Sequence, residues 1–263
     1  MYALIVLLLI VIIIVVVLFY KKPAKEIILP ADFKDLLLEN VAFYRSITGD
    51  EKIRFENKVK EFLGYVRIHG VNTNVEDIDR LLVAASAVIP IFAFPEWKYY
   101  NLRDVLLYPG TFNKEQFLSG SDPRNTLGMV GNGAMQRVMI LSKPALRSGF
   151  KNDTGKENTG IHEFVHLLDK EDGAVDGLPE ALLKRHYLVP WLELMNHNIE
   201  AINTGHSDIN FYGSANKAEF FAVAAEYFFG RPDLFKENHE ELYNLMTKIF
   251  HQQPPAPLFK YEN

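Results

Sequence analysis

The first twenty residues have a hydrophobic pattern unlike the rest of the chain. Residues 2–20 are apolar throughout, without charge, glycine or proline, and as a helix would be about 28 Å long, close to the roughly 30 Å of a bilayer core. No basic residue precedes this run and no small-residue cleavage site follows it, which disfavours a signal peptide. Its length and uniformity at a terminus disfavour a buried core helix. Lys21, Lys22 and Lys25 follow directly. We expect a transmembrane anchor over residues 1–22, in the lipid bilayer through residues 2–20, with the following domain in the cytoplasm.

Beyond a proline-containing linker at residues 23–30, helical periodicity dominates. Apolar residues recur every three to four positions, which predicts a first helix over residues 33–44, a second over 50–65 and a third over 75–89. Pro90 ends the third helix. We interpret their aromatic and aliphatic stripes as core packing, and expect residues 31–95 to form a helical subdomain.

The middle of the chain predicts strands and a long connection. Residues 66–68 and 99–108 have weak strand patterns, whereas RVMILS (137–142) predicts a strand that ends before Pro144. Residues 111–136, rich in Gly, Ser, Asn and Asp, form either a surface loop or part of a substrate groove. KAEFFAVAAEYFFG (217–230) predicts a helix that ends at its glycine. The fold expected is α+β, helix-rich with a small sheet, over residues 31–255, followed by an irregular tail at 256–263.

Composition restricts the chemistry more than it restricts the fold. The chain has 263 residues and a mild net charge of −5 spread along its length, which does not predict nucleic-acid binding. It has no cysteine, which excludes disulfides and thiolate metal sites. Any metal ion must therefore be bound by histidine and carboxylate side chains.

The sequence HEFVH, residues 162–166, matches H-E-x-x-H. On a helix His162 and His166 lie on one face and can bind one metal ion, and zinc suits neutral imidazole nitrogen. Glu163 is then placed to take a proton from an attacking water. The alternative is an amphipathic helix in which the H-E-x-x-H motif occurs by chance. The flanks favour a metal-binding helix, since Asn158 or Thr159 can cap it and apolar residues form one side.

Two ligands do not complete a catalytic site, and the spacing leaves the third open. Asp172 lies six residues after His166, but no glycine lies between them to break the helix and turn the chain back toward the metal. Glu219 lies on an apolar helix, where a carboxylate needs a partner such as a metal ion. However, Asn216 and Glu219 also have the spacing of a capping box, in which the glutamate binds no metal.

Two further carboxylates are candidates for orienting the ligands. Asp169, on the same helical face as His166, can orient that imidazole or can be a surface carboxylate. Glu226, two turns after Glu219, can act behind a ligand or pair with a cation. We interpret the remaining histidines as structural or exposed.

These motifs together resemble the Mlc titration factor A family of zinc-dependent metallopeptidases. The resemblance spans roughly residues 30–255 and is strongest from 137 to 235. It rests on HEFVHLLD followed by Gly173, Asp176-Gly177 and Pro179, then a tyrosine ahead of KAEFFAVAAEYFF and RPDLF, with YPGTF (108–112) less specific.

The resemblance implies a zincin-like domain similar to the peptidase domain of anthrax lethal factor. It implies zinc held by His162, His166 and Glu219, Glu163 as the base, and Tyr212 stabilising the transition state; Tyr212 is otherwise a surface aromatic. Aminopeptidase-type activity is implied as well. The founding member is soluble and binds a transcriptional repressor, whereas this chain begins with an expected anchor.

Two functions therefore follow from the sequence. The first is a membrane-anchored peptidase acting on peptides or proteins, with residues 137–142 as the edge strand that pairs with an extended substrate. The second is a membrane-tethered protein that sequesters a transcriptional regulator, with zinc in a structural role. The intact Glu163 favours catalysis, since a structural zinc site has no use for it.

Overall fold

The computed structural model describes residues 29–110, 112–113, 125–126, 128–130, 137–151 and 154–258. Within these ranges no helix has the length and apolar character needed to cross a bilayer. The expected anchor, most of the linker and the last five residues of the tail lie outside the described residues.

The N-terminal part is helical, as the periodicity predicts, with one difference. Its helices are α2 (Phe33–Asn40), α3 (Ala42–Ser46), α4 (Gly49–Tyr65) and α5 (Asp77–Val88). The first predicted helix is split because Val41 has extended backbone angles, φ −117° and ψ 100°, and its side chain is fully buried. A β-branched residue adopts this conformation readily. Thr48 and Glu51 form a capping box that sets the start of α4.

A four-stranded sheet lies beside these helices in the order β1-β2-β6-β5, with β1 (Arg67–Gly70), β2 (Asp104–Tyr108), β6 (Val138–Ser142) and β5 (Gly128–Val130). The first three strands are parallel and β5 is antiparallel to β6. The interpretation of residues 137–142 as an edge strand is therefore wrong, because β6 is paired on both sides. The edge strand that lies against the central helix is β5. A separate two-stranded ribbon joins β3 (Phe112–Asn113) and β4 (Asn125–Thr126).

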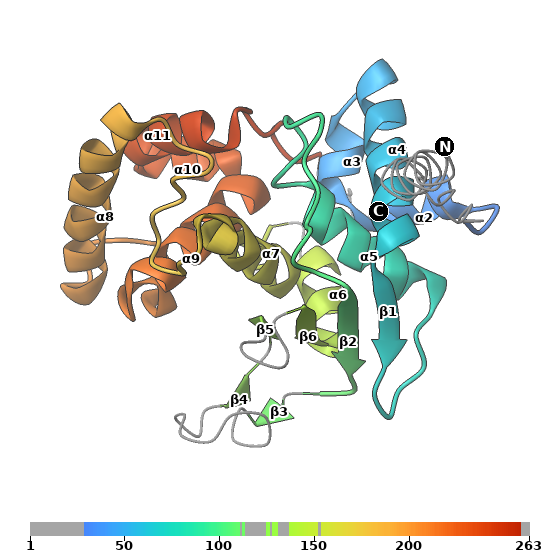
Figure 1. Cartoon of the computed structure of the whole chain (residues 1–263). Coiled ribbons are helices and arrows are strands. Elements are labelled where there is room, and N and C mark those ends of the chain that lie inside the picture. The colour runs from blue at the N-terminus through green and yellow to red at the C-terminus, as the bar shows by residue number, and fades with distance from the viewer. Residues whose placement is uncertain are drawn as a thin grey trace, which may run out of the picture.

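The remaining helices surround α7 (Thr159–Asp169), which runs through the middle of the molecule (Figure 1). The sheet and the N-terminal helices lie on one side of α7 and the C-terminal helices on the other. These other helices are α6 (Lys143–Lys151), η3 (Lys170–Asp172), η4 (Arg185–Tyr187), α8 (Leu188–Asn203), η5 (Phe211–Ser214), α9 (Lys217–Gly230), α10 (Pro232–Asn238) and α11 (Glu240–Phe250).

One hydrophobic core joins both sides of α7. Phe164 of α7 contacts Phe62 of α4 and Tyr99, with ring centroids 5.6 and 5.1 Å apart. Gly160 lets α7 approach α5, since a Cβ atom there would lie 2.1 Å from the Ser86 hydroxyl oxygen. Residues 31–95 thus contribute to the same core that supports α7.

Candidate metal centre

The motif helix begins where the sequence places a cap. The Asn158 side chain accepts a hydrogen bond from the backbone N–H of Ile161 at 3.0 Å, which satisfies a donor in the first turn of α7. Ile161, Phe164 and Leu168 are buried in the core. Packing of this apolar side fixes the rotation of α7 and directs His162 and His166 toward α9.

Helix α9 is packed against α7 and carries two glutamates. It begins at Asn216, whose side chain accepts from the Glu219 backbone N–H at 3.0 Å. Only this half of the expected capping box forms, because the Glu219 carboxylate turns toward the two histidines. The structure therefore decides between the two interpretations of Glu219 in favour of a group that faces the motif.

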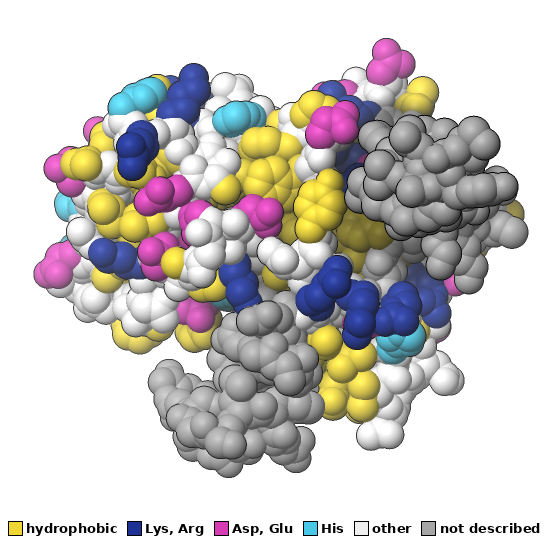
Figure 2. Space-filling view, viewed as in Figure 1, with side chains coloured by type: hydrophobic (Ala, Val, Ile, Leu, Met, Phe, Trp, Pro, Cys, Tyr) yellow, Lys and Arg dark blue, Asp and Glu magenta, His cyan; other side chains and the backbone are white. Residues whose placement is uncertain are grey.

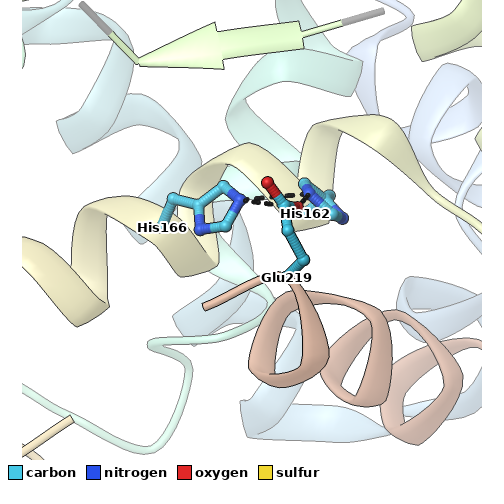
Figure 3. A group of neighbouring side chains, drawn as sticks. All are labelled: His162, His166 and Glu219. Carbon is cyan, nitrogen blue, oxygen red and sulfur yellow. Dashed lines mark hydrogen bonds and ion pairs between the residues drawn. The ribbon is translucent and has the colours of Figure 1, made fainter. Parts of the chain in front are cut away.

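His162, His166 and Glu219 converge between the two helices (Figure 3). The Glu219 Oε2 atom lies 2.9 Å from His162 Nε2 and 3.3 Å from His166 Nε2, and the two Nε2 atoms are 3.1 Å apart. Ligand atoms about 2.0–2.1 Å from a tetrahedral ion would be about 3.4 Å apart. The three groups thus form a candidate metal-binding cluster, with one ligand atom from each within 4.8 Å of the others.

The electrostatics of the cluster suit a cation. Burial disfavours charge on His162, but the carboxylates of Glu226 and Glu219 outweigh this and raise its pKa well above the ordinary value. Burial also disfavours ionised Glu219, yet hydrogen bonds to both histidines lower its pKa. The two carboxylates thus favour positive charge at His162, and a bound cation can supply that charge.

Glu226 lies directly behind His162. Its Oε1 atom is 2.6 Å from His162 Nδ1, and Oε2 accepts from the Asn158 backbone N–H at 2.5 Å. Since a carboxylate only accepts, Nδ1 carries the proton and the Nε2 lone pair of neutral His162 faces the cluster. Glu226 thus fixes both the tautomer and the ring orientation of His162, and ties α9 to the start of α7.

Asp169 is fully buried below His166 but is not hydrogen-bonded to it. Its Oδ2 atom accepts from the Gly177 backbone N–H at 2.8 Å, whereas Oδ1 and His166 Nδ1 are both buried without a hydrogen-bond partner among the described residues. Burial raises the pKa of Asp169 to about 6. Asp169 therefore anchors the turn at Gly177, and the structure does not show it orienting His166.

Glu163 and Tyr212, the two residues expected to act on the substrate, are both close to His162, the first in sequence and the second in space. Glu163 follows His162 on α7 and is buried, with 5% of its surface exposed. The Tyr212 ring centroid is 6.0 Å from that of His162, and 46% of the residue is exposed. Asn210 sets this position, because its side chain accepts from the Tyr212 backbone N–H at 2.8 Å and donates to the Glu157 carboxylate.

A second polar cluster secures the segment that leads to Tyr212. Asp208 accepts from Lys156 Nζ at 2.5 Å and from the Tyr227 hydroxyl at 2.7 Å, and lies 2.6 Å from His239 Nε2. Burial opposes its charge, but the hydrogen bond from Lys156 and those from its other partners hold the pKa of Asp208 well below its usual range. The segment before Tyr212 is thus joined to the start of α7 and to α9.

Asp172, the alternative third ligand, is not in the cluster. It is exposed, and its oxygens accept from the backbone N–H groups of Ala174 and Glu180. Sequence reasoning also missed several residues that organise the site. Asn210, Glu157 and Asp208 belong to no motif, and only Asn158 carried a signal, as a helix cap.

Comparison with known proteins gives first the class and then the family. The chain belongs to the peptidase M90 family, described as glucose-regulated metallo-peptidases, whose model matches residues 20–251. Membership implies a bound metal and a peptide or protein substrate. It also confirms the resemblance stated from the motifs, since the relatives include proteins named Mlc titration factor A.

Three relatives illustrate the similarity. The uncharacterized protein slr2042 of Synechocystis sp. is 27% identical over 236 residues, covering 86% of each chain. The Mlc titration factor A of Pectobacterium atrosepticum is 26% identical over 201 residues, 71% of this chain and 73% of the relative. That of Yersinia pestis is 27% identical over 177 residues, 62% and 63% respectively.

Proposed function

We propose that this chain is a membrane-anchored, zinc-dependent peptidase with a zincin-like catalytic domain. The observation that carries the proposal is the convergence of His162, His166 and Glu219, with Glu163 the next residue after His162 on α7. Two neutral imidazoles and one carboxylate form a donor set that suits zinc and leaves a fourth position open. When bound, zinc supplies a Lewis acid that polarises the scissile carbonyl and makes water acidic.

The chain's own residues do the remaining work. Glu163 accepts the proton of the attacking water and passes it to the leaving amine. Its burial, with 5% of the residue exposed, limits the access of bulk water to this proton transfer. Tyr212 donates a hydrogen bond to the oxygen that becomes negative in the transition state. Glu226 keeps His162 in the tautomer that binds metal.

The substrate lies along β5. Within the described residues this strand is paired with β6 only, and it lies against the motif helix. An extended peptide can add to its other edge through backbone hydrogen bonds. This geometry suits any peptide held by its main chain, and aminopeptidase preference would depend on recognition of the free amine. Residues 2–20 hold the domain at the cytoplasmic face of a membrane.

The test uses the full chain in detergent or nanodiscs, with zinc content measured alongside cleavage of a fluorogenic peptide and aminoacyl panel. Glu163→Gln keeps the ligands and is expected to retain zinc while losing activity by several orders of magnitude. Glu193→Gln, an exposed carboxylate on α8, is the matched control and leaves activity unchanged. Activity in Glu163→Gln equal to that of wild type refutes the proposal.

A second function is favoured by the names of the relatives. Proteins named Mlc titration factor A cover most of this chain, and that name denotes titration of a regulator. The alternative is a membrane-tethered protein that sequesters a transcriptional regulator, with zinc structural or activity latent. If wild type and Glu163→Gln both hold one zinc per chain and neither cleaves the panel, this function replaces the first.

A further inference from the structure

Four arginines gather at one edge of the parallel sheet. Arg67 begins β1, Arg103 immediately precedes β2 and Arg137 immediately precedes β6. Their backbones are linked in a row, because Arg67 N–H donates to the Arg103 carbonyl and Arg103 N–H donates to the Arg137 carbonyl, both at 2.9 Å. Arg80 of α5 donates to the Ile68 carbonyl beside this row. We name these four residues the arginine edge.

Parallel pairing is what places them together. Strands β1, β2 and β6 start at the same edge, and neighbouring strands are about 4.8 Å apart. Arginines next to the strand starts therefore form a row with the spacing of the sheet. Figure 2 shows a row of Lys and Arg side chains over this part of the molecule, with a histidine next to it.

Internal carboxylates balance only part of this charge. Asp104 is 7% exposed and pairs with Arg67 Nε and Arg103 Nε, both at 2.7 Å. Burial opposes the charge of Asp104, but hydrogen bonds from these two arginines lower its pKa. Asp77 lines the same surface cavity as Arg67 and Arg80. Asp104 thus pairs with two of the four guanidinium groups, and more than half of the Arg67 and Arg103 side chains remains exposed.

The arginine edge lies where the described chain begins. Leu29 and Pro30 line a surface cavity of about 680 Å³ together with Arg67, Arg80 and His69. Residues 21–28 separate Leu29 from the apolar run that ends at Tyr20. Nine Cα–Cα steps reach at most roughly 32 Å. If residues 2–20 are in a bilayer, Leu29 lies within that distance of Tyr20 at the end of the span, and Arg67 and Arg80 line the same cavity as Leu29.

We propose that the arginine edge docks on the phosphate groups of an anionic bilayer, and so sets the orientation of the domain above the membrane. The proposal rests on the membrane anchor proposed above, but not on peptidase activity. Arginine binds phosphate through paired N–H donors. Each basic group near an anionic surface strengthens binding about 5-fold. Arg80 and Arg137, the two arginines that do not pair with Asp104, therefore raise the equilibrium constant for docking on the order of 25-fold.

The test exploits the absence of cysteine from the chain. Asn101→Cys introduces one thiol, exposed between Tyr100 and Arg103, for a fluorophore. The full chain is reconstituted into vesicles of phosphatidylcholine, with or without about a third phosphatidylglycerol, that carry a headgroup nitroxide quencher. Quenching is expected in the anionic vesicles only, and is reversed by high salt. A label at Asn203→Cys, exposed at the end of α8, is expected to remain unquenched in both.

A charge variant separates docking from folding. Arg80→Gln with Arg137→Gln removes two guanidinium groups and leaves the partners of Asp104 in place. It is expected to lose most of the lipid-dependent quenching, with unchanged circular dichroism and metal content. The matched control is Lys184→Gln with Lys217→Gln. Both lysines are exposed and lie far from the arginine edge in the sequence, and this variant is expected to keep the quenching.

Three kinds of result overturn the proposal. The first is a quenching result that does not depend on charge, either equal quenching at Asn101→Cys in both vesicles or unchanged quenching in the arginine variant. The second is reversal by inorganic phosphate at constant ionic strength, which would assign the edge to free phosphate. The third is failure of the chain to float with either vesicle, which removes the anchor and this docking while leaving the peptidase assay unaffected.

Discussion

Replacing Glu226 by glutamine should weaken metal binding although Glu226 is not a ligand. The wild-type carboxylate accepts two hydrogen bonds, from His162 Nδ1 and from the Asn158 backbone N–H. A glutamine has one acceptor oxygen. If its oxygen faces His162, its NH2 group faces the Asn158 N–H. Both groups are donors, so the hydrogen bond to Asn158 is lost. If its NH2 group faces His162, Nδ1 must accept, and the proton moves to Nε2, where it blocks metal binding.

Either orientation costs affinity. Loss of a carboxylate behind a metal-binding histidine typically weakens metal binding 10–100-fold, and loss of one charge-assisted hydrogen bond costs about 1.5–3 kcal/mol of stability. The expected result for Glu226→Gln is thus a zinc Kd raised roughly 10–100-fold, measured by competition with a chelating dye. The reasoning is refuted if the folded variant binds zinc within about threefold of wild type while Glu219→Gln, which removes a ligand, does not.

Three other changes test the surroundings of the site. Gly160→Ala drives a methyl group into Ser86 and should cost about 1–3 kcal/mol in urea unfolding, whereas no change would mean that α5 and α7 separate easily. Burial raises the pKa of Asp169 to about 6, above its unfolded value near 3.8, so the stability of the metal-free protein falls as pH rises through about 4–6. Asp169→Asn should remove up to about 3 kcal/mol of that fall. An unchanged dependence of stability on pH in this variant contradicts the reasoning. Asn210→Ala releases the Tyr212 backbone and should lower kcat roughly tenfold to 100-fold at constant zinc content, whereas a change in KM alone would argue against positioning.

The helices that carry the site could be predicted from the sequence because local signals agree there. An asparagine cap precedes both α7 and α9, and each has a long apolar pattern. The end of α9 was predicted at Gly230, where the structure has it. Ligand spacing within α7 follows from helical geometry alone, so His162 and His166 required no tertiary information.

The rest depended on partners that are far apart in the chain. Pro144 predicts the end of a strand, and the structure places it in the first turn of α6 as well, a position that proline tolerates. Whether residues 137–142 form an edge or an inner strand depends on β5, whose pairing no local pattern indicates. The choice between a cap and a metal ligand for Glu219 depended on where α7 packs. Helices α8 and α11 were not predicted.

The division of the cluster between α7 and α9 makes the metal a reversible cross-link. His162 and Glu219 are 57 residues apart, and a chain without cysteine has no disulfide to join them. An ion that binds only the folded chain stabilises it by about 2.7 kcal/mol at 100 times its Kd. Metal supply would therefore set the lifetime of the protein as well as its activity. A chelator should therefore lower the midpoint of thermal unfolding of the full chain before any substrate is involved.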